Sequence, residues 1–358
     1  MKKLKLIFVF VLTVCLTEHS LPQTYEGAFH EIFFGPQPST RAEAMGRSIA
    51  SIPADPDSYY YNPAGLAALN GWNINGCGTS VSKYDLLPAA SFGFFGSSFK
   101  FRKLGTIGLS VETFNSGEFN LTYVNENGDT VSGKFHNYVN NCRLTLCREI
   151  ANRFYAGGNL NIFIPDYDFG YLPLDKGNQG SPFLYFDLGL MKSIGFGKRD
   201  LKQELNFGAS LINVNSAKYK SADEKEEGSL PVIMRIGTSY NLLLNRTFNF
   251  LFNAEYEDLL NSKYYDGIHT GFEFSLDPLL YLRAGFYTED VPEKNIHSQL
   301  TYGAGINILF LGYFAGMERM PKFKIILDYS HLNLPSYIKE SQENNKADSY
   351  TLTLTVRF

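Results

Sequence analysis

Histidine and serine are the residues of this chain that first invite a search for catalytic chemistry. The six histidines stand at positions 19, 30, 136, 269, 297 and 331, and none has the spacing of a metal site or of an HExxH helix. Asp328, Ser330 and His331 form the one close trio, but Ser330 and His331 would point to opposite faces of a strand. We therefore predict no catalytic residue, no metal site and no cofactor, and a protein that is not an enzyme.

Three further patterns have a structural and a functional interpretation. His269 and Glu273 lie four apart on one strand face, which suits either a proton-linked pair or ordinary lining of an interior. The acidic run Asp223–Glu227 lacks EF-hand spacing, which favours a solvated loop over a calcium site. Gly157 and Gly158 are followed by no helix with a Lys-Ser/Thr pair, so they predict bent strands or close backbone approach rather than a phosphate loop.

Three cysteines follow the N-terminal leader: Cys77, Cys142 and Cys147. An odd number cannot form a closed set of disulfides. Cys142 and Cys147 are five apart in an extended segment, so they face opposite sides and lie too far apart to bridge. The sequence favours small apolar fillers, with a disulfide from Cys77 to one of the other two as the alternative.

The composition narrows the class of protein. The 358 residues carry 32 basic and 36 acidic side chains, and a net charge of −4 does not point to a nucleic-acid partner. Aromatic residues make up 15% and charged residues 19%, which excludes a disordered chain. Beyond the first 20 residues no apolar run approaches the roughly 18 residues of a transmembrane helix. What remains is a soluble all-β protein or a transmembrane β-barrel.

The first 20 residues have the order of a secretory signal peptide. Lys2, Lys3 and Lys5 precede an apolar stretch from Leu6 to Leu16, and polar residues follow. The apolar stretch is too short to span a bilayer. We predict a signal peptide over residues 1–20, with cleavage between Thr17 and Thr24.

Period-two alternation dominates the chain from Gly71 onward. The segment from Tyr350 to Phe358 places aromatic and aliphatic residues on one face, with three threonines and an arginine on the other. We identify fourteen such segments, most of them about as long as a tilted strand that crosses a bilayer. They lie near 71–81, 88–101, 104–114, 135–148, 152–165, 183–195, 202–214, 230–243, 246–257, 267–276, 279–288, 299–310, 321–331 and 348–358.

The connections between these segments predict an all-β, 14-stranded antiparallel transmembrane barrel over residues 71–358. Short turns are expected at 102–103, 149–151, 196–200, 244–245, 277–278 and 311–320, and longer connections at 115–134, 166–182, 215–229, 258–266, 289–298 and 332–347. Outer-membrane barrels alternate short periplasmic turns with longer outer loops in this way. A soluble barrel with the apolar face inside is the alternative.

In a membrane barrel the apolar face meets lipid and the other face lines a lumen. Charged residues expected in the lumen are Glu112, Arg143, Asp187, Arg235, Glu255, Glu257, His269, Glu273, Arg283, Asp328 and Arg357. Aromatic residues expected there are Phe95, Tyr155, Phe163, Tyr185, Tyr281 and Tyr287.

Residues 25–70 break the alternation and predict a helical plug, or hatch. Residues 40–52 have the composition of a short helix with Ser39 as its cap, and Asn62 with Pro63 starts a second helix. These helices have few apolar residues for a core of their own, so we expect them inside the lumen. Arg41, Glu43, Arg47, Asp55 and Asp57 would then pair with lumen charges.

The stretch TRAEAMGRSIASIPADPDSYYYNPAGLAAL, residues 40–69, resembles the N-terminal signature of the PorV/PorQ family, a branch of the FadL-like outer-membrane barrels. The segments NAEYEDL, YLRAGF, YGAGINI and ILDYSHLN also resemble strands of that family, so the resemblance covers nearly the whole exported chain. The chain departs from the family at Glu43 and Arg47, where small residues are common. The resemblance therefore supports the family more strongly than any subgroup within it.

The resemblance implies a 14-stranded barrel with an N-terminal hatch in a bacterial outer membrane. Mapped onto this sequence, the hatch motif comprises Arg41, Met45, Gly46, Asn62, Pro63, Ala64 and Gly65. The terminal Phe358 is similar to the aromatic signal read by the barrel assembly machinery. Partners implied are outer-membrane lipid and that machinery, and no nucleic acid.

Two functions compete. The PorV/PorQ resemblance implies a non-enzymatic accessory or adaptor in type IX protein secretion, which binds secretion components or cargo domains through an outer loop. Apolar candidates for that contact are Tyr167, Phe169, Tyr171 and Leu172. The wider FadL resemblance implies a transporter in which a hydrophobic small molecule binds inside and leaves as the hatch rearranges. The sequence leaves both hypotheses open.

Overall fold

The computed structural model describes residues 37–82, 91–124, 130–168, 182–198, 201–220, 227–245, 247–260, 266–291, 295–309, 323–334 and 345–356. The predicted signal peptide lies outside these residues. Among the described helices, none combines the length and the apolar character needed to cross a membrane.

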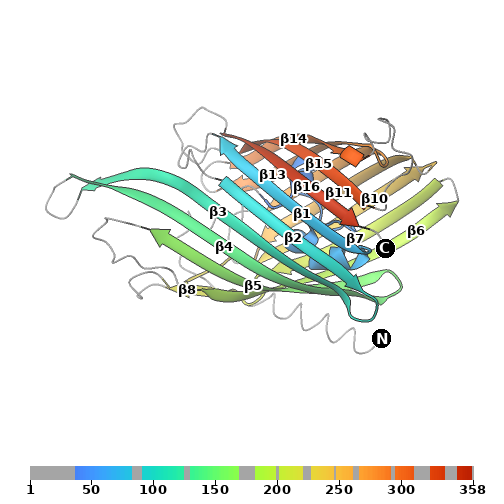
Figure 1. Cartoon of the computed structure of the whole chain (residues 1–358), viewed down its shortest axis with the longest axis horizontal. Coiled ribbons are helices and arrows are strands. Elements are labelled where there is room, and N and C mark those ends of the chain that lie inside the picture. The colour runs from blue at the N-terminus through green and yellow to red at the C-terminus, as the bar shows by residue number, and fades with distance from the viewer. Residues whose placement is uncertain are drawn as a thin grey trace.

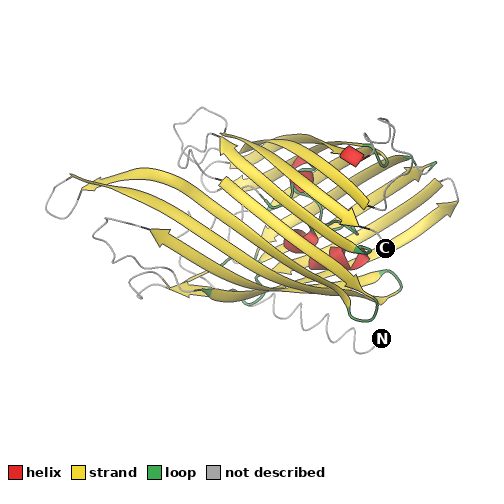
Figure 2. Cartoon of the chain, viewed as in Figure 1, coloured by secondary structure: helices red, strands yellow, loops and turns green. Residues whose placement is uncertain are grey.

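The described chain is dominated by one large antiparallel sheet (Figures 1 and 2). Its strands are β1 (Trp72–Ser82), β2 (Ser91–Phe101), β3 (Gly105–Val124), β4 (Thr130–Ala151), β5 (Phe154–Asp168), β6 (Phe183–Lys198), β7 (Leu201–Ile212), β10 (Ile233–Leu244), β11 (Phe248–Leu259), β12 (Gly267–Leu276), β13 (Leu280–Val291), β14 (Asn295–Asn307), β15 (Phe323–Leu334) and β16 (Asn345–Val356). Each strand pairs with its neighbour in the chain, except that β7 pairs with β10. The sheet closes where Trp72 of β1 stands opposite Val356 of β16.

The two faces of the barrel wall have opposite chemistry. Large apolar side chains point outward along many strands, among them Leu109, Ile236 and Leu300, which are 61%, 52% and 65% exposed. Charged and amide side chains point inward and are buried. Because an apolar exterior is stable only against lipid, this arrangement supports the membrane barrel and rejects the soluble one.

Most predicted lumen residues are buried on the inner face as expected. The exception among the described aromatic residues is Phe95, which is 56% exposed and belongs to the outer face, while Phe92 and Phe94 point inward. The prediction failed because three of the four residues 92–95 are phenylalanine, so hydrophobicity alone does not separate the faces of β2. Arg357 lies outside the described residues.

The structure corrects the predicted loop at 115–134, most of which is strand. β3 and β4 pair from Thr106 opposite Cys147 to Val124 opposite Thr130, and this hairpin projects beyond the neighbouring strands in Figure 1. A register shift lies between Asn115 and Glu118, where Gly117 has a φ of 72°. An extra residue in one strand reverses which alternate positions share a face, so the single-register pattern was lost here.

Smaller corrections concern the other connections. The predicted loop at 215–229 contains a two-stranded sheet of β8 (Lys218–Lys220) and β9 (Glu227–Ser229). The predicted loop at 289–298 is mostly strand, because β13 and β14 extend into it. The turn expected at 149–151 lies at Asn152 and Arg153, where Arg153 has a left-handed φ of 50°.

Residues 37–69 lie inside the barrel, and we call them the inserted segment (Figure 2). They form α3 (Thr40–Ala44), α4 (Ser58–Tyr61) and the 3₁₀ helix η1 (Pro63–Ala68). The helix predicted over 40–52 therefore ends at Ala44, and α4 was not predicted. Gly46 and Arg47 adopt left-handed φ values of 63° and 62°, which end the helix.

Candidate functional site

The site is the contact between the inserted segment and the inner wall of the barrel. Ser39 begins α3, because its side chain accepts a hydrogen bond from the Ala42 amide at 3.0 Å. This cap places Arg41 toward the wall. Arg41 binds Asp55 through Nη1 at 2.6 Å and Glu273 of β12 through Nη2 at 2.8 Å.

A chain of ion pairs continues from Arg41 into the wall. Glu273 also binds Arg283 of β13 at 2.6 Å, and Arg283 binds Asp328 of β15 at 2.5 Å. The predicted pairing of plug charges with lumen charges is confirmed for Arg41. His269 is not the partner of Glu273, because its Nδ1 lies 3.1 Å from the carbonyl oxygen of Gly46.

Asp57 is held differently, by neutral donors. Its carboxylate accepts hydrogen bonds from Ser39 Oγ at 2.6 Å and from Asn75 Nδ2 of β1 at 2.5 Å. The expected pairing of Asp57 with a lumen cation is therefore wrong. Burial, together with the nearby charge of Asp55, raises the pKa of Asp57 from 3.8 to about 7.

Other groups of the inserted segment also have shifted pKa values, among them Arg41 and Tyr60. Burial alone would lower the pKa of Arg41, but Glu273 and Asp55 hold it well above its usual range. Burial raises the pKa of Tyr60 to about 12. Arg41 is therefore a permanent cation in this contact, and Tyr60 is neutral.

The first wall contact of the hatch motif is made by the backbone of Gly46. Its amide donates to Thr301 Oγ1 at 3.1 Å, and a Cβ at this position would lie 2.6 Å from the carbonyl oxygen of Thr270. A Cβ at Gly285 of β13 would in turn collide with the Gly46 amide. Glycine is needed on both sides because the two backbones touch.

The second contact is made by the Asn62-Pro63-Ala64 stretch. Asn62 Oδ1 accepts from the Ala64 amide at 3.1 Å, so the predicted cap is confirmed. Asn62 Nδ2 donates to Ala50 O at 2.7 Å and to Leu190 O of β6 at 3.1 Å. Pro63 packs against Gly157 of β5. A Cβ on Gly157 would lie only 2.7 Å from the carbonyl carbon of Pro63, so a larger residue would not fit there. Close backbone approach is thus the role of this wall glycine.

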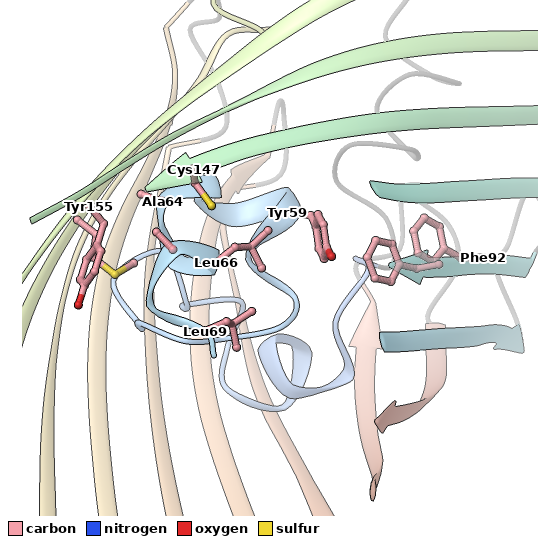
Figure 3. Close-up of a cluster of buried hydrophobic side chains, with 10 residues drawn as sticks. Tyr59, Ala64, Leu66, Leu69, Phe92, Cys147 and Tyr155 are labelled. Atoms are coloured by element: carbon pink, nitrogen blue, oxygen red, sulfur yellow. The ribbon is translucent and has the colours of Figure 1, made fainter. Parts of the chain in front are cut away.

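An apolar cluster completes the contact on one side (Figure 3). Leu66 and Leu69 of the inserted segment and Tyr155 of β5 belong to it, and all three are buried. Its other members are Tyr59, Ala64, Ala67, Phe92, Phe94, Cys147 and Met191. Cys147 thus acts as an apolar filler, and Cys142 and Cys147 are both free thiols, as predicted.

Two further wall arginines hold carboxylates near the inserted segment. Arg235 binds Glu257 at 2.5 Å, lies 3.8 Å from Glu255, and stacks over the Tyr60 ring at 4.9 Å. Glu255 also accepts from the Ala50 amide at 2.8 Å. Arg143 binds Glu112 at 2.6 Å and lies 3.9 Å from Asp187. The inserted segment is therefore fastened through charge, amide and apolar contacts together.

All seven residues assigned to the hatch motif lie within the inserted segment and, apart from half-buried Arg41, are buried. They meet the wall at separate places, since Gly46 contacts β12 and β13 whereas Asn62 contacts β6. Of the residues predicted to contact a partner through an outer loop, the structure describes one. Tyr167 is a position of β5, whereas Phe169, Tyr171, Leu172 and the terminal Phe358 lie outside the described residues. The predicted close approach at Gly157 is confirmed, whereas the contacts of Asn75 and of other wall glycines such as Gly285 were not predicted. The glycines left a signal, since several fall on the inward positions of alternating strands.

No protein family and no curated protein matches the sequence. Solved structures do match in fold. A TodX mutant described as a monoaromatic hydrocarbon channel is 10% identical with a TM-score of 0.52, and the match covers 90% of this chain and 99% of that one. The Pseudomonas putida toluene transporter TodX is 10% identical with a TM-score of 0.51, and the match covers 90% of this chain and 99% of that one. The Ralstonia pickettii toluene transporter TbuX is 9% identical with a TM-score of 0.50, and the match covers 90% of this chain and 98% of that one.

These similarities concern the fold, and the fold agrees with the chemistry of the wall. An apolar exterior on a closed antiparallel barrel belongs in an outer membrane. The chain therefore has the same barrel fold as the solved TodX and TbuX structures.

Proposed function

We propose that this chain is a non-enzymatic outer-membrane channel for hydrophobic small molecules. In this proposal the barrel has fourteen strands and residues 37–69 are its plug. The observation that carries the proposal is the noncovalent contact between the inserted segment and a wall that has the fold of hydrocarbon channels. Three solved structures that match in fold are described as transporters of toluene or channels for monoaromatic hydrocarbons.

The contact is suited to a gate because it is divided into separable parts. Arg41 binds Glu273, the Ala50 amide binds Glu255, and Asn62 binds the Leu190 carbonyl. Each part is a set of hydrogen bonds or ion pairs, whose net strength is modest because solvent can replace the partners. A ligand that binds better when the plug is displaced would shift the plug out of the lumen.

The secretion adaptor remains a hypothesis from sequence. Its loop contact rests on Phe169, Tyr171 and Leu172, which are outside the described residues, and on Tyr167, whose strand position alone is described. Within the described part of the inner wall, no feature favours the adaptor over the channel. We therefore propose the channel, with hydrophobic ligands as its partners and outer-membrane lipid around it.

Uptake by intact cells tests the proposal. Cells that produce the chain should take up radiolabelled toluene faster than cells with an empty vector, because an outer leaflet of lipopolysaccharide slows free entry of hydrocarbons. The rate should saturate with toluene concentration. Equal uptake by producing and control cells, with the barrel shown to be inserted, would reject the channel.

A further inference from the structure

The charged residues buried in the barrel wall are not balanced. Among the described wall residues, six carboxylates and three arginines are buried, so the wall has a net charge of −3 when all are ionised. The carboxylates are Glu112, Asp187, Glu255, Glu257, Glu273 and Asp328, and the arginines are Arg143, Arg235 and Arg283. Two carboxylates thus share each arginine.

The sharing is visible in the distances. Arg143 lies 2.6 Å from Glu112 and 3.9 Å from Asp187. Arg235 lies 2.5 Å from Glu257 and 3.8 Å from Glu255. Arg283 binds Glu273 and Asp328 at 2.6 and 2.5 Å. Each wall arginine therefore already has two carboxylates as neighbours.

The inserted segment does not restore the balance. Arg41 is bound by Asp55 as well as by Glu273, and Arg47 pairs with Glu43 at 3.0 Å. Asp57 adds a carboxylate held by neutral donors. Half-buried lysines occur only where the described wall approaches its short turns. Lys100 donates to Ala67 O, Lys192 donates to Asn152 O, and Lys324 pairs with Asp277 at 3.0 Å.

Some acceptor atoms near these wall charges have no hydrogen-bond partner in the part of the chain that the structure describes, which also disfavours a negatively charged ligand. Glu255 Oε1 is buried with no hydrogen-bond partner among the described residues, and Glu255 is 3% exposed. The amides of Asn75 and Asn141 are oriented because their NH₂ groups donate to Asp57 and Glu112. Their Oδ1 atoms are left buried and unpartnered within the described chain. A ligand that satisfies these atoms must bring donors rather than acceptors.

We propose that the lumen favours neutral and cationic hydrophobic molecules and rejects anionic ones of the same shape. This inference rests on the proposed channel and adds the class of ligand it takes. A carboxylate or sulfonate would meet surplus negative charge and orphan acceptors in a site of low dielectric constant, where charge repulsion is strong. A quaternary ammonium has no N–H to donate, but the same negative charge would attract it. An uncharged ring would be little affected.

Unpartnered donor atoms could favour the reverse. Arg235 Nη2 and Asn73 Nδ2 are buried without a hydrogen-bond partner among the described residues, as are hydroxyl groups such as those of Tyr61 and Ser330, so these groups could donate to an anion. The surrounding charge opposes this, because Glu255 and Glu257 outnumber the guanidinium they share.

Equilibrium dialysis of the detergent-solubilised full chain at pH 9 measures which of two oppositely charged probes binds more tightly, without depending on transport. The probes are benzyltrimethylammonium and benzenesulfonate, which carry one aromatic ring and a permanent charge of opposite sign. We expect the ammonium to bind at least about tenfold more tightly, the order given by one uncompensated charge within about 10 Å at an effective dielectric constant of about 20. The triple variant E112Q/E255Q/D328N, which neutralises the wall, should lose most of that preference.

Two further variants separate the lumen from the net charge of the protein. Glu255→Gln keeps an acceptor for the Ala50 amide and removes one surplus charge, so it should lose part of the preference even if the triple variant does not fold. Glu149→Gln removes the same charge from an exposed position next to a short turn and should leave the preference unchanged. Equal binding of the two ions, tighter binding of the sulfonate, or the same preference in Glu255→Gln as in Glu149→Gln would overturn the inference. Failure of the channel proposal would show separately, as toluene uptake that does not depend on the chain.

Discussion

Asp57 shows how much a single side chain contributes to the state of the inserted segment. Its carboxylate joins Ser39 of that segment to Asn75 of the wall, and it lies beside Asp55 without a cationic partner among the residues that the structure describes. Arg41 is bound by Asp55 and Glu273, and Arg283 and Asp328 extend that chain of charges. Asp57 is the member of this group whose charge is best placed to change with pH.

The pH dependence of stability follows from the shifted pKa of Asp57. A folded-state pKa of about 7 against 3.8 for the free side chain means that the folded protein binds the proton more tightly. The protonated carboxyl therefore stabilises the fold fully below about pH 4, and this contribution is lost as the pH rises through about 7.

Asp57→Asn should remove that dependence. Between pH 4 and pH 7 the free energy of unfolding of the unaltered chain should fall relative to that of the variant, by at most about 1.4 kcal/mol per pH unit. Denaturant titrations of both proteins in lipid vesicles at several pH values measure the difference. Parallel stability curves for the two proteins would show that Asp57 does not titrate in this range.

At the same scale, sequence reasoning reached the local contacts and missed the distant ones. The caps at Ser39 and Asn62 were predictable because the residues involved lie two or three positions apart. The contact of Asp57 with Asn75 was not, because the chain between them turns back before β1 begins. The orientation of Phe95 was missed because only the register of β2 with β1 and β3 assigns its face.

At the scale of elements, the inserted segment fits because short helices alternate with backbone turns. α3 ends where Gly46 turns left-handed, and this turn brings the backbone against β12 and β13. The same turn explains why the predicted helix over 40–52 is only five residues long. Helix propensity favoured continuation, but the tertiary contact of Gly46 with the wall prevailed.

Gly46→Ala tests that contact. The new Cβ would meet backbone atoms of Thr270 and Phe286 at 2.6 to 2.8 Å and would also penalise the left-handed φ by about 1–2 kcal/mol. We expect the inserted segment to leave its place, so a cysteine introduced at the buried position of Ser48 should become reactive to a water-soluble maleimide.

Gly93→Ala is the matched control. A Cβ at Gly93 of β2 would meet nothing within 4 Å, so the same maleimide should react as slowly as in the unaltered background. Similar labelling rates for the Gly46 and Gly93 variants would mean that the Gly46 contact does not hold the segment.

The extended hairpin shows a different limit of sequence reasoning at this scale. The alternation of β3 changes register between Asn115 and Glu118, and the stretch beyond it contains Asn, Thr and Gly, which are common in loops. A pattern search that assumes one continuous register ends the strand at the bulge. By contrast, strands such as β11 and β12 kept one register and were predicted almost to their ends.

At the scale of the whole molecule, the barrel was predictable because its physical requirement is simple. Lipid demands an apolar exterior and a closed ladder of backbone hydrogen bonds, so alternation and short turns recur along the chain. The charge balance of the lumen could not be predicted in the same way. The individual lumen charges were identified from the sequence, but their two-to-one sharing depends on which strands become neighbours across the ladder.

The most direct measurement of the central claim locks the inserted segment in place. Asn253 Nδ2 of β11 lies 2.9 Å from Ser48 Oγ of the segment, so the double variant S48C/N253C brings two thiols together across the contact. Toluene uptake is then measured in producing cells before oxidation, after oxidation and after reduction, with S48C alone as the control for oxidation of native cysteines. If movement of the segment opens the channel, oxidation should stop uptake in the double variant alone, and reduction should restore it. Uptake that continues at the same rate through a fully cross-linked barrel would contradict the account.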